Sequence, residues 1–233
     1  MEWRTPALEQ VLIETDLLMV EIAELGDRER GAQAFEARAF DVNLPPILDR
    51  VPEGERAALA TSLEAAGIDP DALVHTETWA AAMQLGNAIS CFDAANGVDR
   101  NLLRESDETL SLESHARQFA AFDGLPADAQ VALLLTVSEE SDCRTANARV
   151  EAWLVGDIEA LEASILAGFR GNAALRETLV DIRNEAYADR IADYQANEPN
   201  VDLLVAVGAG HMVGESGLPA LLSERGYTLR RIQ

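Results

Sequence analysis

The segment VDLLVAVGAGHMVGESG, residues 201–217, constrains the fold of this chain more than any other. Its five consecutive apolar residues, 203–207, are typical of a strand that is buried on both faces of a parallel sheet. Gly208 and Gly210 then allow a sharp turn, which presents His211 just beyond the carboxyl end of the strand. Because ligands of open α/β sheets bind at that end, we predict an α/β fold with a histidine at its binding edge.

A second apolar run, LLMVEI at residues 17–22, also indicates a buried strand, and it contains a single charged residue, Glu21. Burying a carboxylate at a strand end is costly unless it has a partner. Glu21 therefore occupies the same kind of position as His211, and we expect both to belong to one site. A salt-bridged glutamate and a loop histidine without a catalytic role are the alternatives that these patterns leave open.

The rest of the chain is mainly helical, and we expect a single domain over residues 1–233. Residues 16–22 and 201–232 are the sheet-forming parts, the latter ending in a strand at 227–232. Residues 110–113 form another short strand that ends at Glu113, and a long helix at 172–195 carries Arg183 and Asn184. The predicted fold is a mixed, mostly parallel sheet with a large helical insertion, and its mainly helical parts are residues 27–96 and 114–195.

Composition excludes several classes of function. The formal net charge is −23, and all 18 basic residues are arginines, so we expect no nucleic-acid partner. A chain without lysine cannot form a lysine Schiff base or a P-loop. We see no membrane span and no export signal in the sequence as given.

The remaining cysteines and histidines give weaker expectations. Cys91 and Cys143 are too far apart for a CxxC motif, and we expect two buried thiols, with a single disulfide as the alternative in an exported protein. His75 precedes a helix and is expected at the surface or as a cap. His115 is expected on a helix surface.

With these residues located, the chain resembles the TraB/PrgY/GumN family, whose relatives include the Tiki metalloproteases. The resemblance covers nearly the whole chain, and the order and spacing of the matching segments carry it. The matching segments are WRTPALEQVLIETDLLMVEI (3–22), NLPPILDR (43–50), WAAAMQLGNAIS (79–90), GVDRNLL (97–103), LESHARQFAAFDGLP (112–126), EAWLVGDIEAL (151–161), the RN pair (183–184) and VGAGHMVGESGLPALLSERGYTL (207–229).

The resemblance implies a helix-rich α/β fold like that of the Tiki, EreA and ChaN-like proteins, and a hydrolase-like site built from two GxxH motifs and a glutamate. His211 matches the histidine of the second GxxH, whose first glycine is Gly208. Glu21 matches the acidic residue that ends a strand, Glu113 the glutamate before the central helix, and Arg183 the arginine of the RN pair. The Tiki branch binds a divalent metal, and exported relatives imply the bacterial periplasm or cell envelope.

The family places a strand with the first GxxH before the segment that matches residues 3–22, and no such motif is present here. We therefore expect either a truncated gene model, which has also lost an export signal, or a degenerate member of the family.

The leading hypothesis is a metal-dependent hydrolase of peptide-like substrates, which can be inactive as this chain. His211 and Glu21 would bind Mn, Co or Zn, Glu113 would be a third ligand or a general base, and Arg183 would hold a substrate carboxylate or an oxyanion. Gly208, Gly210 and Asn184 would support the site. The main alternative is a non-catalytic binding or regulatory protein on the same scaffold. A third hypothesis is haem binding through His211 or Tyr187. The substrate, whether a peptide or a small molecule, and the oligomeric state are not readable from the sequence.

Overall fold

A sheet of three parallel strands forms the centre of one half of the protein, in a computed structural model that describes residues 3–140 and 143–232. β1 (Leu17–Val20) lies between β2 (Thr109–Ser111) and β3 (Leu203–Ala206), and Leu18 pairs with Thr109 on one side and Leu204 on the other. The expected α/β class and the parallel sheet are thus confirmed.

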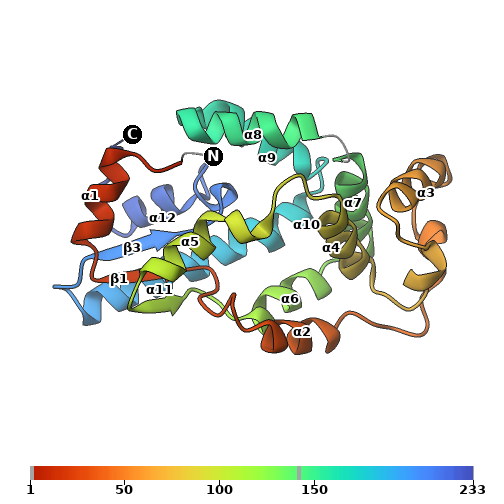
Figure 1. Cartoon of the computed structure of the whole chain (residues 1–233), viewed down its shortest axis with the longest axis horizontal. Coiled ribbons are helices and arrows are strands. Elements are labelled where there is room, and N and C mark those ends of the chain that lie inside the picture. The colour runs from red at the N-terminus through yellow and green to blue at the C-terminus, as the bar shows by residue number, and fades with distance from the viewer. Residues whose placement is uncertain (1–2, 141–142, 233) are drawn as a thin grey trace.

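Helices cover both faces of this sheet, which is why β1 is apolar at every position (Figure 1). Met19 points to one face and packs with α11 (Ile182–Asn197) and α12 (Leu218–Glu224). Leu18 and Val20 point to the other face and pack with Leu102 of α5 (Val98–Glu105) and with Leu12 of α1 (Pro6–Glu14). The alternation along the strand assigns successive side chains to opposite cores.

The second half of the protein consists of helices that pack around α4 (Thr78–Ile89) and α7 (Ala127–Glu139). Around this pair lie α2 (Arg28–Glu36), α3 (Arg56–Ala65), α6 (His115–Asp123) and the short helical turns η1 (Ile47–Arg50), η2 (Glu53–Glu55) and η3 (Pro70–Leu73). The short turn η4 (Ala94–Asn96) contacts α5 instead. Trp79 is fully buried at the start of α4, in contact with the rings of Phe35, Phe119 and Phe122. The apolar side of α4 is therefore part of the core.

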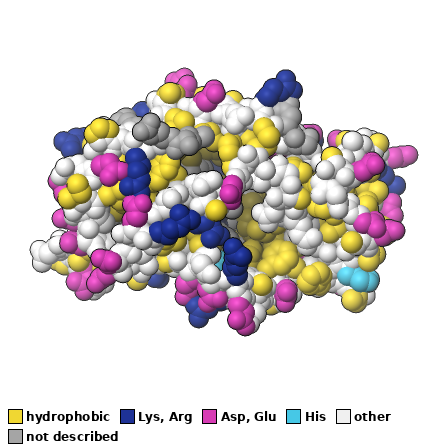
Figure 2. Space-filling view, viewed as in Figure 1, with side chains coloured by type: hydrophobic (Ala, Val, Ile, Leu, Met, Phe, Trp, Pro, Cys, Tyr) yellow, Lys and Arg dark blue, Asp and Glu magenta, His cyan; other side chains and the backbone are white. Residues whose placement is uncertain are grey.

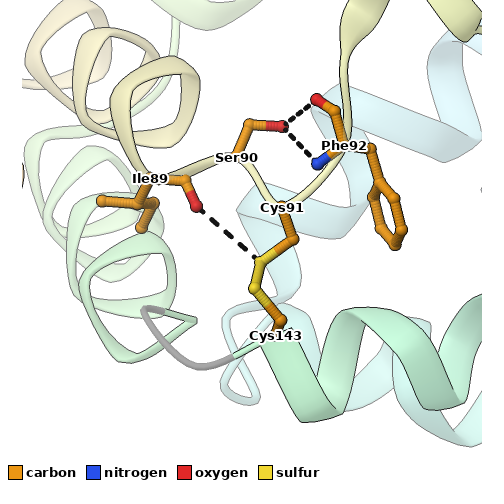
Figure 3. The surroundings of a disulfide bond; sticks show 5 residues. All are labelled: Ile89, Ser90, Cys91, Phe92 and Cys143. Carbon is orange, nitrogen blue, oxygen red and sulfur yellow. Dashed lines mark hydrogen bonds between the residues drawn. A yellow bond between two sulfur atoms is a disulfide. The ribbon is translucent and has the colours of Figure 1, made fainter.

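A helical hairpin of α8 (Cys143–Val155) and α9 (Ile158–Gly168) lies across one side of the molecule (Figure 1). Cys143, its first residue, forms a disulfide with Cys91 in the loop after α4 (Figure 3). The expectation of two buried thiols was wrong: Cys91 is half-buried and Cys143 exposed, and the fold places their Cα atoms 5.6 Å apart. A single pair of cysteines gives no spacing pattern from which this pairing could be read.

The long helix expected at 172–195 is interrupted. α10 (Ala173–Arg176) passes into a π-helical turn, η5 (Glu177–Asp181), and then into α11. The N–H of Ile182 donates to the carbonyl of Glu177, five residues earlier. A π turn inserts one extra residue per turn and is frequent at functional sites.

Three further details differ from the sequence expectations. Residues 227–232 are irregular rather than a strand, and in the described part of the chain they pair with none of the strands β2, β1 and β3. The second strand ends at Ser111, two residues before Glu113, and α5 lies outside the two segments, 27–96 and 114–195, that were expected to be mainly helical. Among the described residues no single helix is long and apolar enough to cross a membrane, although α6 and α7 meet the length and composition criteria together, with a bend of 106° between them.

Candidate functional site

Residues that follow the three strands meet at the carboxyl edge of the sheet. Glu21 directly follows β1, Glu113 follows β2, and His211 ends the short turn η6 (Ala209–His211) after β3. The N–H of Glu113 donates to the carbonyl of Glu21 at 2.9 Å, so a main-chain hydrogen bond holds the residues after β1 and β2 together. The strand ends point toward the middle of the molecule (Figure 1), and Figure 2 shows a hollow in the middle of that face, with hydrophobic side chains on its floor.

Arg183 of α11 bridges the two carboxylates. Its Nη2 lies 2.8 Å from Oε2 of Glu21 and 2.5 Å from Oε1 of Glu113, and its Nε donates to Glu113 as well. Nη1 donates to the carbonyl of Leu179 in the π turn. Burial alone would lower the pKa of Arg183, but its hydrogen bonds to Glu113 and the surrounding negative charges raise it, so the guanidinium is charged.

Tyr187, one turn further along α11, completes this network. Its hydroxyl donates to Oε1 of Glu113 at 2.6 Å and accepts a hydrogen bond from Nη2 of Arg183 at 2.7 Å. Burial is the main cause that raises the pKa of Tyr187, which therefore remains a neutral donor. Glu113 is thus committed to Arg183 and Tyr187, with Gln118 adding a longer contact of 3.4 Å.

Asn184 determines which nitrogen of His211 carries a proton. The Nδ2 of Asn184 faces two carbonyl groups, at 2.7 Å from that of Ser216 and 3.4 Å from that of His211, so this atom must be the amide donor. Its Oδ1 then faces Nδ1 of His211 at 2.6 Å and can only accept. In the neutral ring the proton is therefore on Nδ1, and Nε2 carries a free lone pair.

The carboxylate of Glu21 lies near this nitrogen. Nε2 of His211 lies 3.7 Å from Oε2 of Glu21. Burial lowers the pKa of His211, and the positive charge of Arg183 acts in the same direction, whereas Glu21 and Glu113 oppose it. The ring is consequently neutral near pH 7, and two electron-pair donors face each other across this gap.

The pair fits a shared cation. Two bonds of ~2.1 Å at a tetrahedral angle place the ligand atoms ~3.4 Å apart, close to the observed separation. A hydrogen bond that fixes the second ring nitrogen is also the usual arrangement for a metal-bound histidine. Among the described residues, however, no group of three His, Cys, Asp or Glu side chains is arranged to hold a metal. His211 and Glu21 supply two ligands, and Glu113 faces Arg183 instead.

Gly208 holds the carboxylate of Glu21 in place. Its N–H donates to Oε1 at 2.8 Å, and a Cβ at this position would lie 3.2 Å from the same oxygen. Gly210 is less constrained, since a Cβ there would meet only Ile165, at 4.0 Å. The first glycine of the GxxH motif therefore has a direct contact to the site, and Gly210 has a supporting place in the turn.

Two residues near the site, Asp99 and Tyr187, are not predicted as site residues by the sequence patterns. Asp99, in the first turn of α5, has a raised pKa because it is buried and because the negative charge of Glu21 is near. For Tyr187 the sequence suggests only haem binding, although its spacing of four residues from Arg183 places both on one face of a helix. The sequence signal for Asp99 is its place in the segment GVDRNLL, directly after the turn that begins α5.

The other histidines lie outside the site. His75 is exposed, as expected. His115 was expected on a helix surface, but its ring stacks on Phe119 and packs against Gly31 of α2, and its Nε2 is buried. Aromatic packing between α2 and α6 accounts for this difference.

Neither the curated proteins nor the solved structures with which we compared the chain gave a match. The profile of the TraB/PrgY/gumN family matches residues 1–231, which is almost the entire sequence. This protein therefore belongs to the TraB/PrgY/gumN family.

Proposed function

We propose that this protein is a metal-dependent hydrolase of peptide-like substrates, with its reactive centre at the carboxyl edge of the sheet. The observation that carries the proposal is the neutral His211, whose Nε2 lone pair faces Oε2 of Glu21 at 3.7 Å. Either a divalent metal or a proton would reconcile these two donors, and the lowered pKa of His211 disfavours the proton.

His211 and Glu21 would hold the metal, which when bound supplies a Lewis acid and an acidified water. Asn184 keeps Nε2 of His211 free for this role, and Gly208 keeps the carboxylate of Glu21 turned toward it. Arg183 places a fixed positive charge beside the centre, where it would stabilise an oxyanion. Glu113 orients Arg183 and Tyr187 rather than acting as a ligand.

The main alternative is a binding or regulatory protein without catalysis. It is favoured by the hydrogen bonds of Arg183, whose guanidinium is already fully engaged within the protein. Its side chain already engages Glu21, Glu113, Tyr187 and a main-chain carbonyl. In that case the network is a buried support for the sheet edge, and His211 is its neutral neighbour. Location in the bacterial envelope is part of the proposal for either function, and the Cys91–Cys143 disulfide favours an oxidising compartment.

Isothermal titration with Mn²⁺, Co²⁺ and Zn²⁺ separates these functions. We expect saturable binding of one ion by the wild-type chain, and its loss in His211→Ala and in Glu21→Gln. The control is His75→Ala, which removes an exposed histidine and should leave the affinity unchanged. A screen of peptide hydrolysis with the bound metal follows. Binding that is undiminished when both His211 and Glu21 are replaced would disprove the metal site and favour the alternative.

A further inference from the structure

The loop that follows His211 folds back onto the π turn. Gly214 adopts a φ of +79°, and a Cβ at Gly217 would lie 2.8 Å from the carbonyl oxygen of Val213. Both positions thus need glycine, one for its conformation and one for close backbone contact. The tight loop directs Ser216 at η5, the π turn that precedes Arg183 and Asn184.

Ser216 is held there by an ion pair within the interrupted helix. Its hydroxyl donates to Oδ1 of Asp181 at 2.5 Å and accepts a hydrogen bond from Nη2 of Arg176 at 3.1 Å. Nε of Arg176 lies 3.5 Å from the same oxygen of Asp181. Arg176 and Asp181 are five residues apart, and the π turn, whose hydrogen bonds span five residues, brings them together.

The main chain of Ser216 connects this cluster to His211. Its carbonyl accepts the 2.7 Å hydrogen bond from Nδ2 of Asn184, and Oδ1 of Asn184 accepts the proton of Nδ1 of His211. The other tautomer of His211 would require the amide of Asn184 to turn over. Its Oδ1 would then face the carbonyls of Ser216 and His211, which are both acceptors, so the rotated amide is unfavourable as long as Ser216 stays in place.

We propose that Asp181 and Ser216 are positioning residues, which fix the amide of Asn184 and thereby keep the proton of His211 on Nδ1. The functional meaning of this inference rests on the proposed function, because only this tautomer leaves Nε2 of His211 free to bind a metal. Its geometry does not depend on a metal. The π turn aligns Arg176 with Asp181, and it also sets the direction of Asn184.

The test is ¹⁵N NMR of the histidine ring nitrogens, recorded without metal above pH 7, with the signals of His211 assigned by comparison with His211→Gln. The wild-type protein should show the Nδ1–H tautomer. In Asp181→Asn and Ser216→Ala the ratio of tautomers should move toward Nε2–H by about tenfold, the effect expected when a charge-assisted hydrogen bond is lost. Ser216→Thr retains the hydroxyl and should restore the wild-type spectrum.

Asp189→Asn is the matched control, because Asp189 of α11 also pairs with an arginine, Arg225, but its side chain is 67% exposed. An unchanged tautomer in Asp181→Asn and Ser216→Ala would overturn the inference, and so would an equal change in the control. Zn²⁺ affinity, measured separately, should fall by about tenfold in the same two variants, as for other partners that orient metal-bound histidines. If the tautomer ratio of His211 changes in these two variants but the wild-type protein binds no metal, the positioning role is supported and the proposed function is refuted.

Discussion

Replacing Arg183 with methionine should destabilise the protein more than any other single change at the site. The side chain of Arg183 is 11% exposed, and those of its partners Glu113 and Glu21 are 1% and 19% exposed. Methionine has a similar length and keeps the apolar contacts, but it leaves the buried carboxylate of Glu113 without a cation. The hydroxyl of Tyr187 remains as its short hydrogen bond, at 2.6 Å.

The magnitude follows from this burial. Removing one partner of a buried ion pair costs about 3–5 kcal/mol, because the other charge stays desolvated. For a chain of this size each kcal/mol lowers the melting temperature by roughly 2–4 °C, so we expect a decrease of roughly 6–20 °C. A second replacement, Glu113→Gln, removes the unpaired charge and should recover part of this loss in the double variant.

Urea unfolding followed by circular dichroism measures this difference, with the disulfide kept oxidised. The matched control is Arg225→Met, directly after α12, because Arg225 also bridges two carboxylates, Glu185 and Asp189, but these are 58% and 67% exposed. Exposed pairs contribute about 0–1 kcal/mol, so the control should lose little stability. Equal losses in the two variants would show that Arg183 does not hold a buried carboxylate network.

Three further predictions concern pH, the disulfide and the GxxH turn. Burial lowers the pKa of His211 below its ordinary value, so the unfolded chain binds this proton at a higher pH than the folded chain does. The free energy of unfolding, measured with a chelator present, should therefore decrease as the pH falls from about 7. The decrease should be less steep in His211→Gln. Replacing Cys91 and Cys143 with serine opens a cross-link between residues 52 apart in sequence, and the free energy of unfolding in urea should fall by about 2–4 kcal/mol. In Gly208→Ala the new Cβ lies 3.2 Å from Oε1 of Glu21 and displaces that carboxylate. Calorimetry should therefore show a several-fold lower affinity for Zn²⁺, while the free energy of unfolding falls by less than about 1 kcal/mol. An unchanged affinity would contradict the role given to Glu21.

The apolar strands were predictable because burial on both faces leaves a simple signal. Residues 203–207 and 17–22 each contain no more than one charged residue, and they form β3 and β1 almost as expected. Parallel strands share a carboxyl edge, so the meeting of Glu21 and His211 followed from the two patterns. Arg183 and Glu113 came from the resemblance to the family, since an Arg-Asn pair within a helix carries no positional signal of its own.

Other features depend on contacts between distant parts of the chain. The π turn at Glu177–Asp181 is invisible to a helical pattern, because its side chains differ in no obvious way from those of a regular helix. The short helix α5 lies outside the two segments that were expected to be mainly helical, and Asp99 in its first turn is not among the expected site residues. Whether Cys91 and Cys143 pair depends on where α8 lies relative to α4, which no local pattern determines.

Anomalous diffraction from a crystal soaked in Mn²⁺ would show whether His211 and Glu21 hold a metal. We expect one strong peak at the carboxyl edge of the sheet, ~2.0–2.2 Å from both Nε2 of His211 and Oε2 of Glu21, and no such peak in crystals of His211→Ala. A site without any peak, in which Arg183 still bridges Glu21 and Glu113, or a peak only at a surface residue such as His75, would contradict this expectation.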